Sequence, residues 1–326
     1  MNPRTIVIDG HYFLHRCLHL PDLAALQTQD GRKTGGVFGV VTSIKKSLET
    51  FPTVRHCIIT WDTGRSARRM KLLPEYKANR DAQNEEEKAE KEEYKRLFDG
   101  QLSILQENLG YLGIRQVLLN GYEGDDLIGW IVKKSTDPVV VVTEDKDLLQ
   151  VVGPNTCLWM PMKDKLVTID TFLDQIGVPP HLFLMYKALL GDPSDNIPGI
   201  FQVGPKTIQQ IIQTAAHWTP PKNIEEAEDI LVEACQCQPK TKTKKLPAKV
   251  QRVLDSLDTF RLNMDMMDIY QESFTPGAEA VLETLSFGGR HPHFNEQKTV
   301  RFFGEYEFNT LLQWFTQVTS LFRALS

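Results

Sequence analysis

The chain has 326 residues, 41% of them hydrophobic, which is enough for one large or two moderate globular domains. No apolar run approaches the roughly 20 residues of a membrane-spanning helix, and the N-terminus leads into a strand pattern instead of a signal peptide. We therefore expect a soluble cytoplasmic protein with no membrane partner. The 5 cysteines fit a reducing compartment better than a disulfide framework. The net charge of −5, taken alone, argues against a nucleic-acid partner.

Short β-branched runs alternate with helical segments in the first half of the chain. Strands are predicted at residues 5–9, 56–62 and 139–145. A helix over 41–49 separates the first two strands, and a long charged helix precedes the third. Strands separated by helices indicate the α/β class, with a parallel, doubly wound central sheet.

Strand signals fade from about Pro180, and the second half has a mostly helical pattern. Residues 182–199 and 204–216 predict a helix, a turn and a second helix. Residues 307–325 have the apolar spacing of one amphipathic helix that closes the fold. We therefore divide the chain into an α/β domain over 1–180 and a mainly helical domain over 181–326.

Aspartates follow each of the three predicted strands. Asp9 ends the first, Asp62 ends the second, and Asp145 and Asp147 end the third. Because ligands of parallel sheets bind beyond the carboxyl ends of the strands, we expect these groups to meet on one edge. A single aspartate in such a place is often only the N-cap of the next helix. Three acid-bearing strand ends, one of them an Asp-x-Asp pair, exceed what capping requires.

Five further acids lie in two motifs, Glu123, Asp125 and Asp126 at the start of a predicted helix, and Asp192 and Asp195 in a turn. Helix-dipole and turn chemistry would explain one or two of them. Nine unpaired carboxylates packed together would raise one another's pKa values and destabilise the fold. Because these motifs contain no histidine or cysteine, they predict Mg²⁺, for which Mn²⁺ can substitute. Two such ions about 4 Å apart are the common arrangement for phosphodiester hydrolysis. Without these nine carboxylates, the rest of the chain carries a net positive charge. We therefore still expect a nucleic-acid partner.

A basic segment comes directly after Asp62, since residues 65–80 contain six basic side chains and one acid. A solvated charged helix is the alternative explanation, and we accept it for residues 85–96. In the basic segment, Tyr76 offers a ring on which a base could stack beside Lys77 and Arg80. The segment therefore favours a polymer as the substrate.

Six motifs in this order resemble those of the 5′-nuclease (flap endonuclease) family, in particular its stand-alone phage and bacterial 5′–3′ exonucleases. They cover roughly residues 1–212 and read Asp9, Trp61-Asp62, LPEYKANR, GYEGDDLI, TEDKDLLQ and LLGDPSDNIPG. The resemblance implies a monomeric two-metal nuclease that cuts DNA at 5′ ends and flaps and also RNA in RNA–DNA hybrids. It implies work in primer removal or repair, in the cytoplasm of a bacterium or an infected host cell.

The resemblance also implies a role for each motif. One ion is implied at Asp9, Asp62, Glu123 and Asp125, and the second at Asp145, Asp147, Asp192 and Asp195. Asp126 is placed between these sets as a catalytic residue, with Lys77 and Arg80, which are implied to contact the scissile phosphate. Residues 65–98 are implied to begin and form a helical arch over the 5′ strand. The implied nucleic-acid contacts of this part of the chain are Arg68, Arg69, Tyr76 and Lys187.

A helix-hairpin-helix is implied over about residues 184–213, with Gly204 and Lys206 contacting duplex phosphates and K⁺ as a candidate ion at the hairpin. The sequence departs from the family pattern at Gln202, where a glycine is usual. Because glutamine resists a positive φ, close backbone approach to phosphate is in question there.

Two other functions compete with a nuclease. One is a branched-DNA-binding protein without catalysis, against which the intact acids argue, and the other is a two-metal phosphatase for small esters, against which the basic segment argues. A run of six basic residues between Lys240 and Arg252 is either a solvated linker or a further duplex contact. Beyond residue 213, a partner such as a single-strand DNA-binding protein stays an open alternative.

Overall fold

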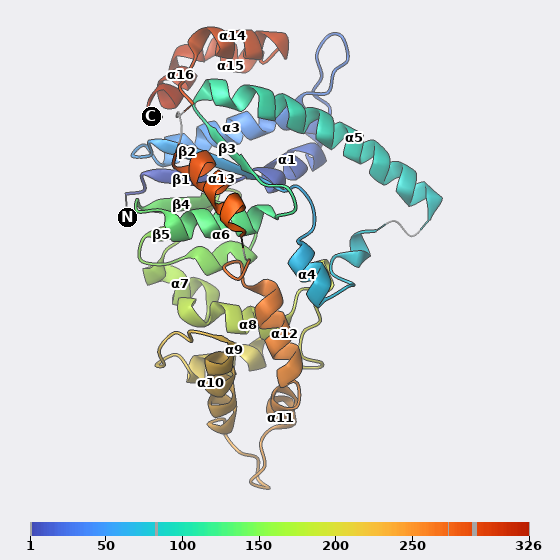
Figure 1. Ribbon diagram of the computed structural model, residues 1–326, viewed down its shortest axis with the longest axis vertical. Helices are drawn as coiled ribbons and strands as arrows, with labels where there is room; N and C mark the ends of the chain where they lie inside the picture. The colour runs from blue at the N-terminus through green and yellow to red at the C-terminus, as the bar shows by residue number, and fades with distance from the viewer. Residues whose placement is uncertain (1, 82–83, 273, 289–291, 326) are drawn as a thin grey trace.

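The computed structural model describes residues 2–81, 84–272, 274–288 and 292–325 (Figure 1). Its sheet consists of β1 (Thr5–Asp9), β2 (His56–Trp61), β3 (Arg115–Leu118), β4 (Val139–Val142), β5 (Thr156–Met160) and β6 (Lys165–Val167). The strands lie in the order β3-β2-β1-β4-β5-β6, and all neighbours are parallel except β5 and β6. The predicted α/β class with a doubly wound sheet is confirmed, whereas β3, β5 and the antiparallel β6 were not foreseen.

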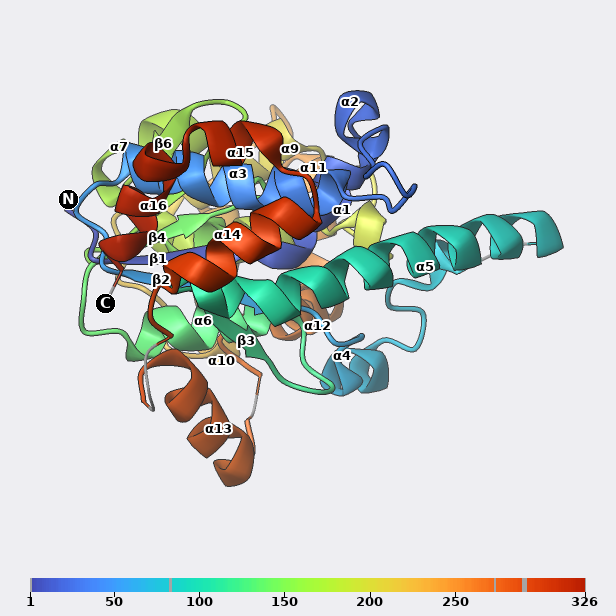
Figure 2. The same ribbon diagram turned by 90° about the horizontal axis from the view of Figure 1, so that it is seen from above.

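Both faces of the sheet are buried, as the unbroken β-branched runs require. Ile6 and Ile8 of β1 face one apolar cluster, and Val7 faces the other. The first cluster is covered by α1 (Gly10–His19), α3 (Gly35–Thr50) and α5 (Glu85–Asn108), and the second by α6 (Gly124–Lys134), α7 (Ile169–Ile176) and α8 (Phe183–Leu190). Helices on both faces therefore give the three-layer arrangement seen in Figure 2.

The second half of the described chain is helical, as predicted. After α8 it contains α9 (Pro205–Thr214), α10 (Ile224–Gln236), α11 (Ala248–Leu254), α12 (Leu257–Met267), α13 (Pro276–Ser286), α14 (Glu296–Glu305), α15 (Asn309–Gln313) and α16 (Phe315–Arg323). The prediction of one helix over 307–325 is wrong, because the helix is interrupted at Trp314. Phe322 and Val318 of α16 nevertheless close the apolar cluster beside α3.

One apolar cluster joins the sheet to the helices that follow it. Val7 and Val141 of the sheet share this cluster with Ile208 of α9 and Phe260 of α12. The described part of the chain is thus packed across residue 180, and the division there into two domains stays a prediction.

The basic segment forms α4 (Ala67–Leu72) and a 3₁₀ turn at Ala78–Arg80, and α2 (Pro21–Ala24) precedes α3. The long helix α5 extends from the sheet far beyond its neighbours, as both views show (Figures 1 and 2). Asn84 caps α5 by accepting a hydrogen bond from the Glu87 backbone N–H. Among the described residues, no helix is both long and apolar enough to span a membrane.

Candidate active site

Carboxylates gather where the strand order reverses, beyond the carboxyl ends of β1, β2 and β4. One cavity there is lined by eight of the nine predicted acids, Asp9, Asp62, Glu123, Asp125, Asp145, Asp147, Asp192 and Asp195. Lys77, Arg80, His11 and His15 lie along the same cavity. Five acid-bearing motifs that are distant in sequence are thereby brought to one edge of the sheet.

Asp9 and Asp62 are held by neutral donors. Asp9 Oδ1 accepts from the Tyr12 backbone N–H at 3.0 Å, and its Oδ2 accepts from Thr143 Oγ1 at 3.0 Å. Asp62 accepts from the backbone N–H of Gly124, the first residue of α6. A Cβ at position 124 would lie 2.6 Å from Asp62 Oδ1, so a larger residue there would force the Asp62 carboxylate to shift. The strand ends and the start of α6 therefore position these two carboxylates together.

Four carboxylates of the site have no cation within ion-pair distance in the described part of the chain, namely Asp9, Asp62, Asp125 and Asp145. Burial, together with the carboxylates of Asp62 and Asp145, raises the pKa of Asp9 to about 7. Burial and the nearby Asp145 also raise the pKa of Asp125, and burial raises that of Asp145. These groups repel one another, and a divalent cation among them would relieve the repulsion.

Lys77 bridges two further carboxylates. Its Nζ lies 2.9 Å from Glu123 Oε1 and 3.9 Å from Asp195 Oδ2, and Arg80 also pairs with Asp195. Although burial would raise the pKa of Glu123, Lys77 and Arg69 hold it below its usual value. The backbone of Lys77 has a φ of 57°, in the left-handed region, and its N–H donates to the Asp195 carbonyl at 2.9 Å. The ammonium group thus lies at the site while the backbone is anchored to Asp195.

Lys187 of α8 likewise lies between two carboxylates, those of Asp147 and Asp192. Its Nζ lies 2.7 Å from Asp147 Oδ1 and 3.5 Å from Asp192 Oδ2. Burial and Asp145 raise the pKa of Asp147 to about 6, although Lys187 opposes the shift. Ser194 donates hydrogen bonds from its backbone N–H and its hydroxyl to Asp192. Although burial would raise the pKa of Asp192, these hydrogen bonds and the nearby Lys187 lower it.

The oxygen donors of this site fit hard divalent cations by their chemistry. In the present arrangement, no three described carboxylate, imidazole or thiol side chains are close enough together to hold a metal ion. Lys77 and Lys187 each share carboxylates that an ion would need. Metal binding at this edge would therefore exchange ammonium contacts of Glu123 or Asp147 for contacts with the ion.

Asp126 does not line the carboxylate cavity, although it was predicted to lie among the other acids as a catalytic residue. It is fully buried, and its carboxylate meets Arg69 at 2.8 and 2.7 Å. Arg69 is itself only 4% exposed, and it also contacts Glu123 Oε2 at 3.1 Å and donates from Nε to the Met266 carbonyl at 2.9 Å. Neither side chain reaches the surface, so this arrangement lends no support to a nucleic-acid contact by Arg69, and the catalytic role of Asp126 stays a prediction.

Tyr76 is also interior, and the prediction that a base stacks on its ring is wrong. Its side chain is 3% exposed and packs against Ile197 and Met266. Its hydroxyl donates to Glu123 Oε2 at 2.9 Å. Arg68 is half-buried and pairs with Asp265 at 2.8 Å, which ties α4 to α12. In this segment, Arg68, Arg69 and Tyr76 therefore make structural contacts, whereas Lys77 and Arg80 line the site.

The predicted helix-hairpin-helix corresponds to α8 and α9 and the turn between them. Gln202 adopts a φ of 57° there, so the backbone has the left-handed shape despite the missing glycine. Gly204, the N-cap of α9, has open space where a Cβ would be, and Lys206 is exposed in the first turn. The neighbouring Phe201 is 76% exposed.

Two histidines of the site were missed from the sequence. His11 and His15 follow Asp9 on α1, and burial lowers the pKa of both, that of His15 to about 4. His15 Nδ1 lies 2.6 Å from the Tyr94 hydroxyl of α5. The available signal was their spacing of four residues on a helix that begins at an acid-bearing strand end.

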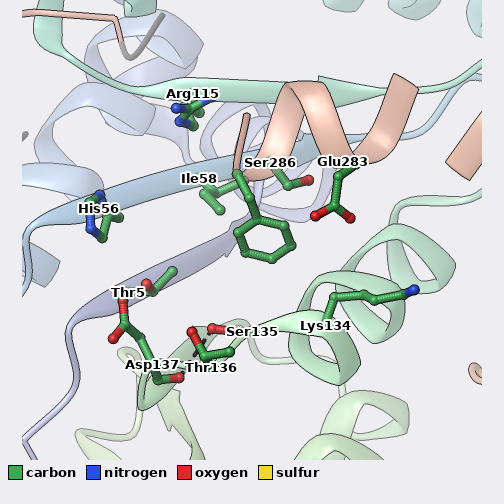
Figure 3. Close-up of a pocket in the computed structure, with 11 residues that line it drawn as sticks. Thr5, His56, Ile58, Arg115, Lys134, Ser135, Thr136, Asp137, Glu283 and Ser286 are labelled. Atoms are coloured by element: carbon green, nitrogen blue, oxygen red, sulfur yellow. Dashed lines mark hydrogen bonds between the residues drawn. The ribbon is translucent and has the colours of Figure 1, made fainter. Parts of the chain in front are cut away.

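A second cavity, shown in Figure 3, lies at the opposite edge of the sheet and contains none of the predicted residues. Its Arg115 donates to the carbonyls of Leu285 at 3.3 Å and Gly288 at 2.7 Å. The guanidinium thereby satisfies carbonyl groups at and beyond the end of α13, which is a structural role.

Comparisons with known proteins give a consistent result. The N-terminal resolvase-like domain of 5′-3′ exonucleases matches residues 4–177. A 5′-3′ exonuclease of Buchnera aphidicola is 29% identical over 209 residues, which are 63% of this chain and 68% of the relative. DNA polymerase I of Lactococcus lactis subsp. cremoris is 32% identical over 222 residues, 64% of this chain. That match spans only 24% of the polymerase.

Solved structures of bacteriophage T5 proteins have the same fold. T5 5′-exonuclease with divalent metal ions (zinc) aligns with a TM-score of 0.66 and 21% identity, covering 87% of this chain and 97% of the T5 chain. A T5 flap endonuclease complex with DNA and metal ions aligns with a TM-score of 0.62 and 20% identity, covering 93% and 99%. The likeness extends beyond residue 177 and includes the helical second half.

Proposed function

Because the chain belongs to the 5′-3′ exonuclease family, we propose that it hydrolyses phosphodiesters at 5′ ends and 5′ flaps of DNA and in RNA–DNA hybrids. Family membership makes the chain a 5′ nuclease and a hydrolase. The substrates, the ions and the residues that act on them are the proposal. Replication primer removal or repair is the process that this substrate preference fits.

The observation that carries the proposal is the gathering of eight carboxylates with Lys77 and Lys187 at the switch point of the sheet. The four acids without a cation partner, Asp9, Asp62, Asp125 and Asp145, are the ligands we propose for one Mg²⁺, a grouping in which Asp145 takes the place that the resemblance gave to Glu123. Asp147, Asp192, Asp195 and Glu123 would serve a second ion once the lysines leave them. Bound ions would activate the attacking water and stabilise charge on the phosphate.

The basic side chains would act on the same phosphate. Lys77 and Arg80 line the carboxylate cavity from the segment below α5, and each is held by Asp195. A phosphate entering with its ions would compete for these cations, which then stabilise its developing charge. Lys187 would do the same from α8. The chain's own residues thus supply positive charge on two sides of the scissile bond.

The second half would hold duplex DNA through the turn between α8 and α9. Gly204 leaves its backbone open to close approach, and Lys206 adds a charge beside it. The left-handed Gln202 supports a turn whose carbonyls could hold K⁺. This contact would fix the distance from the duplex to the carboxylates. The arch over 65–98 would cover the 5′ strand, and the active species would be a monomer.

The competing functions make different predictions for one assay. We would incubate the protein with a labelled 5′-flap oligonucleotide in Mg²⁺ and in EDTA, with p-nitrophenyl phosphate as the small ester. Cleavage of the flap only with Mg²⁺, and no ester hydrolysis, is expected. Binding without cleavage would support the inactive DNA-binding protein, and ester hydrolysis without flap cleavage would support the phosphatase.

A further inference from the structure

The loop between α10 and α11, residues 237–247, carries four of the basic residues singled out in the sequence. We propose that this lysine loop is a second contact for the backbone of duplex DNA, separate from the turn between α8 and α9. The inference rests on the proposed function, because it assigns the loop to the same substrate.

The lysine loop joins two helices that pack around α9, so it is no tether between domains. α10 and α11 pack against each other and against α9. Leu231 of α10 and Val253 of α11 share one apolar cluster with Ile208 of α9. In Figure 1 the loop projects beyond these helices at the end of the molecule opposite α14. A duplex held at the turn before α9 would meet the loop if it extended toward this end of the molecule.

The backbone of the lysine loop is closed by its own hydrogen bonds. The Thr241 N–H donates to the Lys245 carbonyl at 2.8 Å, and the Lys244 N–H donates to the Thr241 carbonyl at 2.8 Å. Lys244 occupies the left-handed region with a φ of 60°. A closed turn holds its charges at one place, so less entropy is lost when a partner binds them.

The charges of this loop are uncompensated within the chain. Lys240, Lys242, Lys244 and Lys245 are exposed, and no described carboxylate lies within ion-pair distance of them. By contrast, Lys77 and Lys187 are both paired with acids of the site. Cations without internal partners are those that external phosphates attract most strongly.

The charge pattern also limits the contact to the tip of the loop. The first half of α10 is acidic, with Glu225, Glu226, Glu228 and Asp229. Phosphates would be repelled there, although Arg261 pairs with Glu228. Residues 237–247 contain no aromatic side chain on which an unpaired base could stack. The chemistry therefore fits the backbone of a duplex better than a single strand.

The test uses a closed dumbbell duplex, which has no 5′ end to cut, and measures its affinity over a range of KCl concentrations. Lys242, Lys244 and Lys245 are replaced together by alanine in the full chain. Each lost phosphate contact flattens the log–log salt slope by about 0.9, so the triple variant should lose about two to three units. The matched control replaces Lys46, Lys133 and Lys298, three exposed lysines on other helices, and should keep the slope.

Replacing the same three loop lysines by arginine should restore the slope, because charge and not shape is required. The rate of flap cleavage by the alanine variant is measured in parallel at saturating enzyme, where weaker binding no longer limits the rate, and it should stay near the wild-type rate. An unchanged slope in the alanine variant, or an equal loss in the control, would overturn the proposal. If the wild-type protein itself failed to cleave the flap, the proposed function would fail, whatever the slope showed.

Discussion

The guanidinium of Arg69 meets the carboxylate of Asp126 in a two-point ion pair inside the protein, with Nη1 2.8 Å from Oδ2 and Nη2 2.7 Å from Oδ1. Arg69 also reaches Glu123 of the site and the backbone of Met266. One side chain therefore connects α4, α6 and α12. Its removal would leave the buried carboxylate of Asp126 without an ion-pair partner among the described residues, whereas Glu123 would keep Lys77.

We expect Arg69→Met to lower the free energy of unfolding by about 3–5 kcal/mol, the usual cost of breaking a buried ion pair from one side. Urea denaturation of the metal-free protein measures the change. Arg65→Met is the matched control, because Arg65 pairs with the exposed Asp81 and should cost only about 0–1 kcal/mol. Equal effects of the two substitutions would show that the interior pair contributes no more than a surface one.

Asp145→Asn tests the set of carboxylates without a cation partner. Losing one ligand should lower single-turnover flap cleavage by roughly 10²–10³-fold, comparable to losing one preorganised charge contact. Affinity for the dumbbell duplex should change little, because basic side chains provide it. Asp170→Asn, at an exposed carboxylate of α7, serves as the control and should cleave normally. Full activity of Asp145→Asn would remove this residue from the proposed ligands.

Lys77→Ala should affect cleavage much more than binding. The ammonium lies between Glu123 and Asp195, at the edge of the cavity, where charge develops on the phosphate during reaction. We expect the single-turnover rate to fall by at least about tenfold more than the affinity, as for a transition-state contact. Lys71→Ala, on the exposed side of α4, is the control. Parallel losses of rate and affinity would make Lys77 a positioning contact only.

The effect of Mg²⁺ on stability should depend on pH. Asp9 and Asp147 have folded-state pKa values raised to about 7 and about 6. The folded chain thus keeps protons that the unfolded chain releases near pH 4, so stability of the metal-free protein should fall as pH rises from about 4 to 7. Mg²⁺ replaces those protons, and its stabilisation should grow over the same range.

Thermal unfolding at pH 5 and pH 8, in Mg²⁺ and in EDTA at matched ionic strength, measures this dependence. At a concentration of 100 times the dissociation constant, one bound ion stabilises by about 2.7 kcal/mol. We expect Mg²⁺ to raise the free energy of unfolding by about that amount at pH 8 and by much less at pH 5. The same shift at both pH values would contradict competition between Mg²⁺ and protons for these carboxylates.

The sequence predicted the edge of the sheet well, because Asp9, Asp62 and Asp145 follow runs of buried β-branched residues. Short strands such as β3 and β6 have too few residues for a period to appear. The interior places of Arg69 and Tyr76 were not predictable from a basic run, because their partners are remote. Met266 is 197 positions from Arg69, and Glu123 is 47 positions from Tyr76. Only the folded chain shows which basic side chains turn inward.

Two backbone carbonyls of helix α12 accept hydrogen bonds from side chains that lie beside the carboxylate site. The carbonyl of Met266 accepts from Arg69 Nε at 2.9 Å, and that of Met267 accepts from Gln150 Nε2 at 3.0 Å. These acceptors lie far outside residues 4–177, the part that matches the exonuclease domain. Residues 1–177 alone would therefore lack both of these hydrogen bonds. An engineer who fused residues 1–177 alone to another protein would leave out helix α12 and also two carboxylates of the site, Asp192 and Asp195.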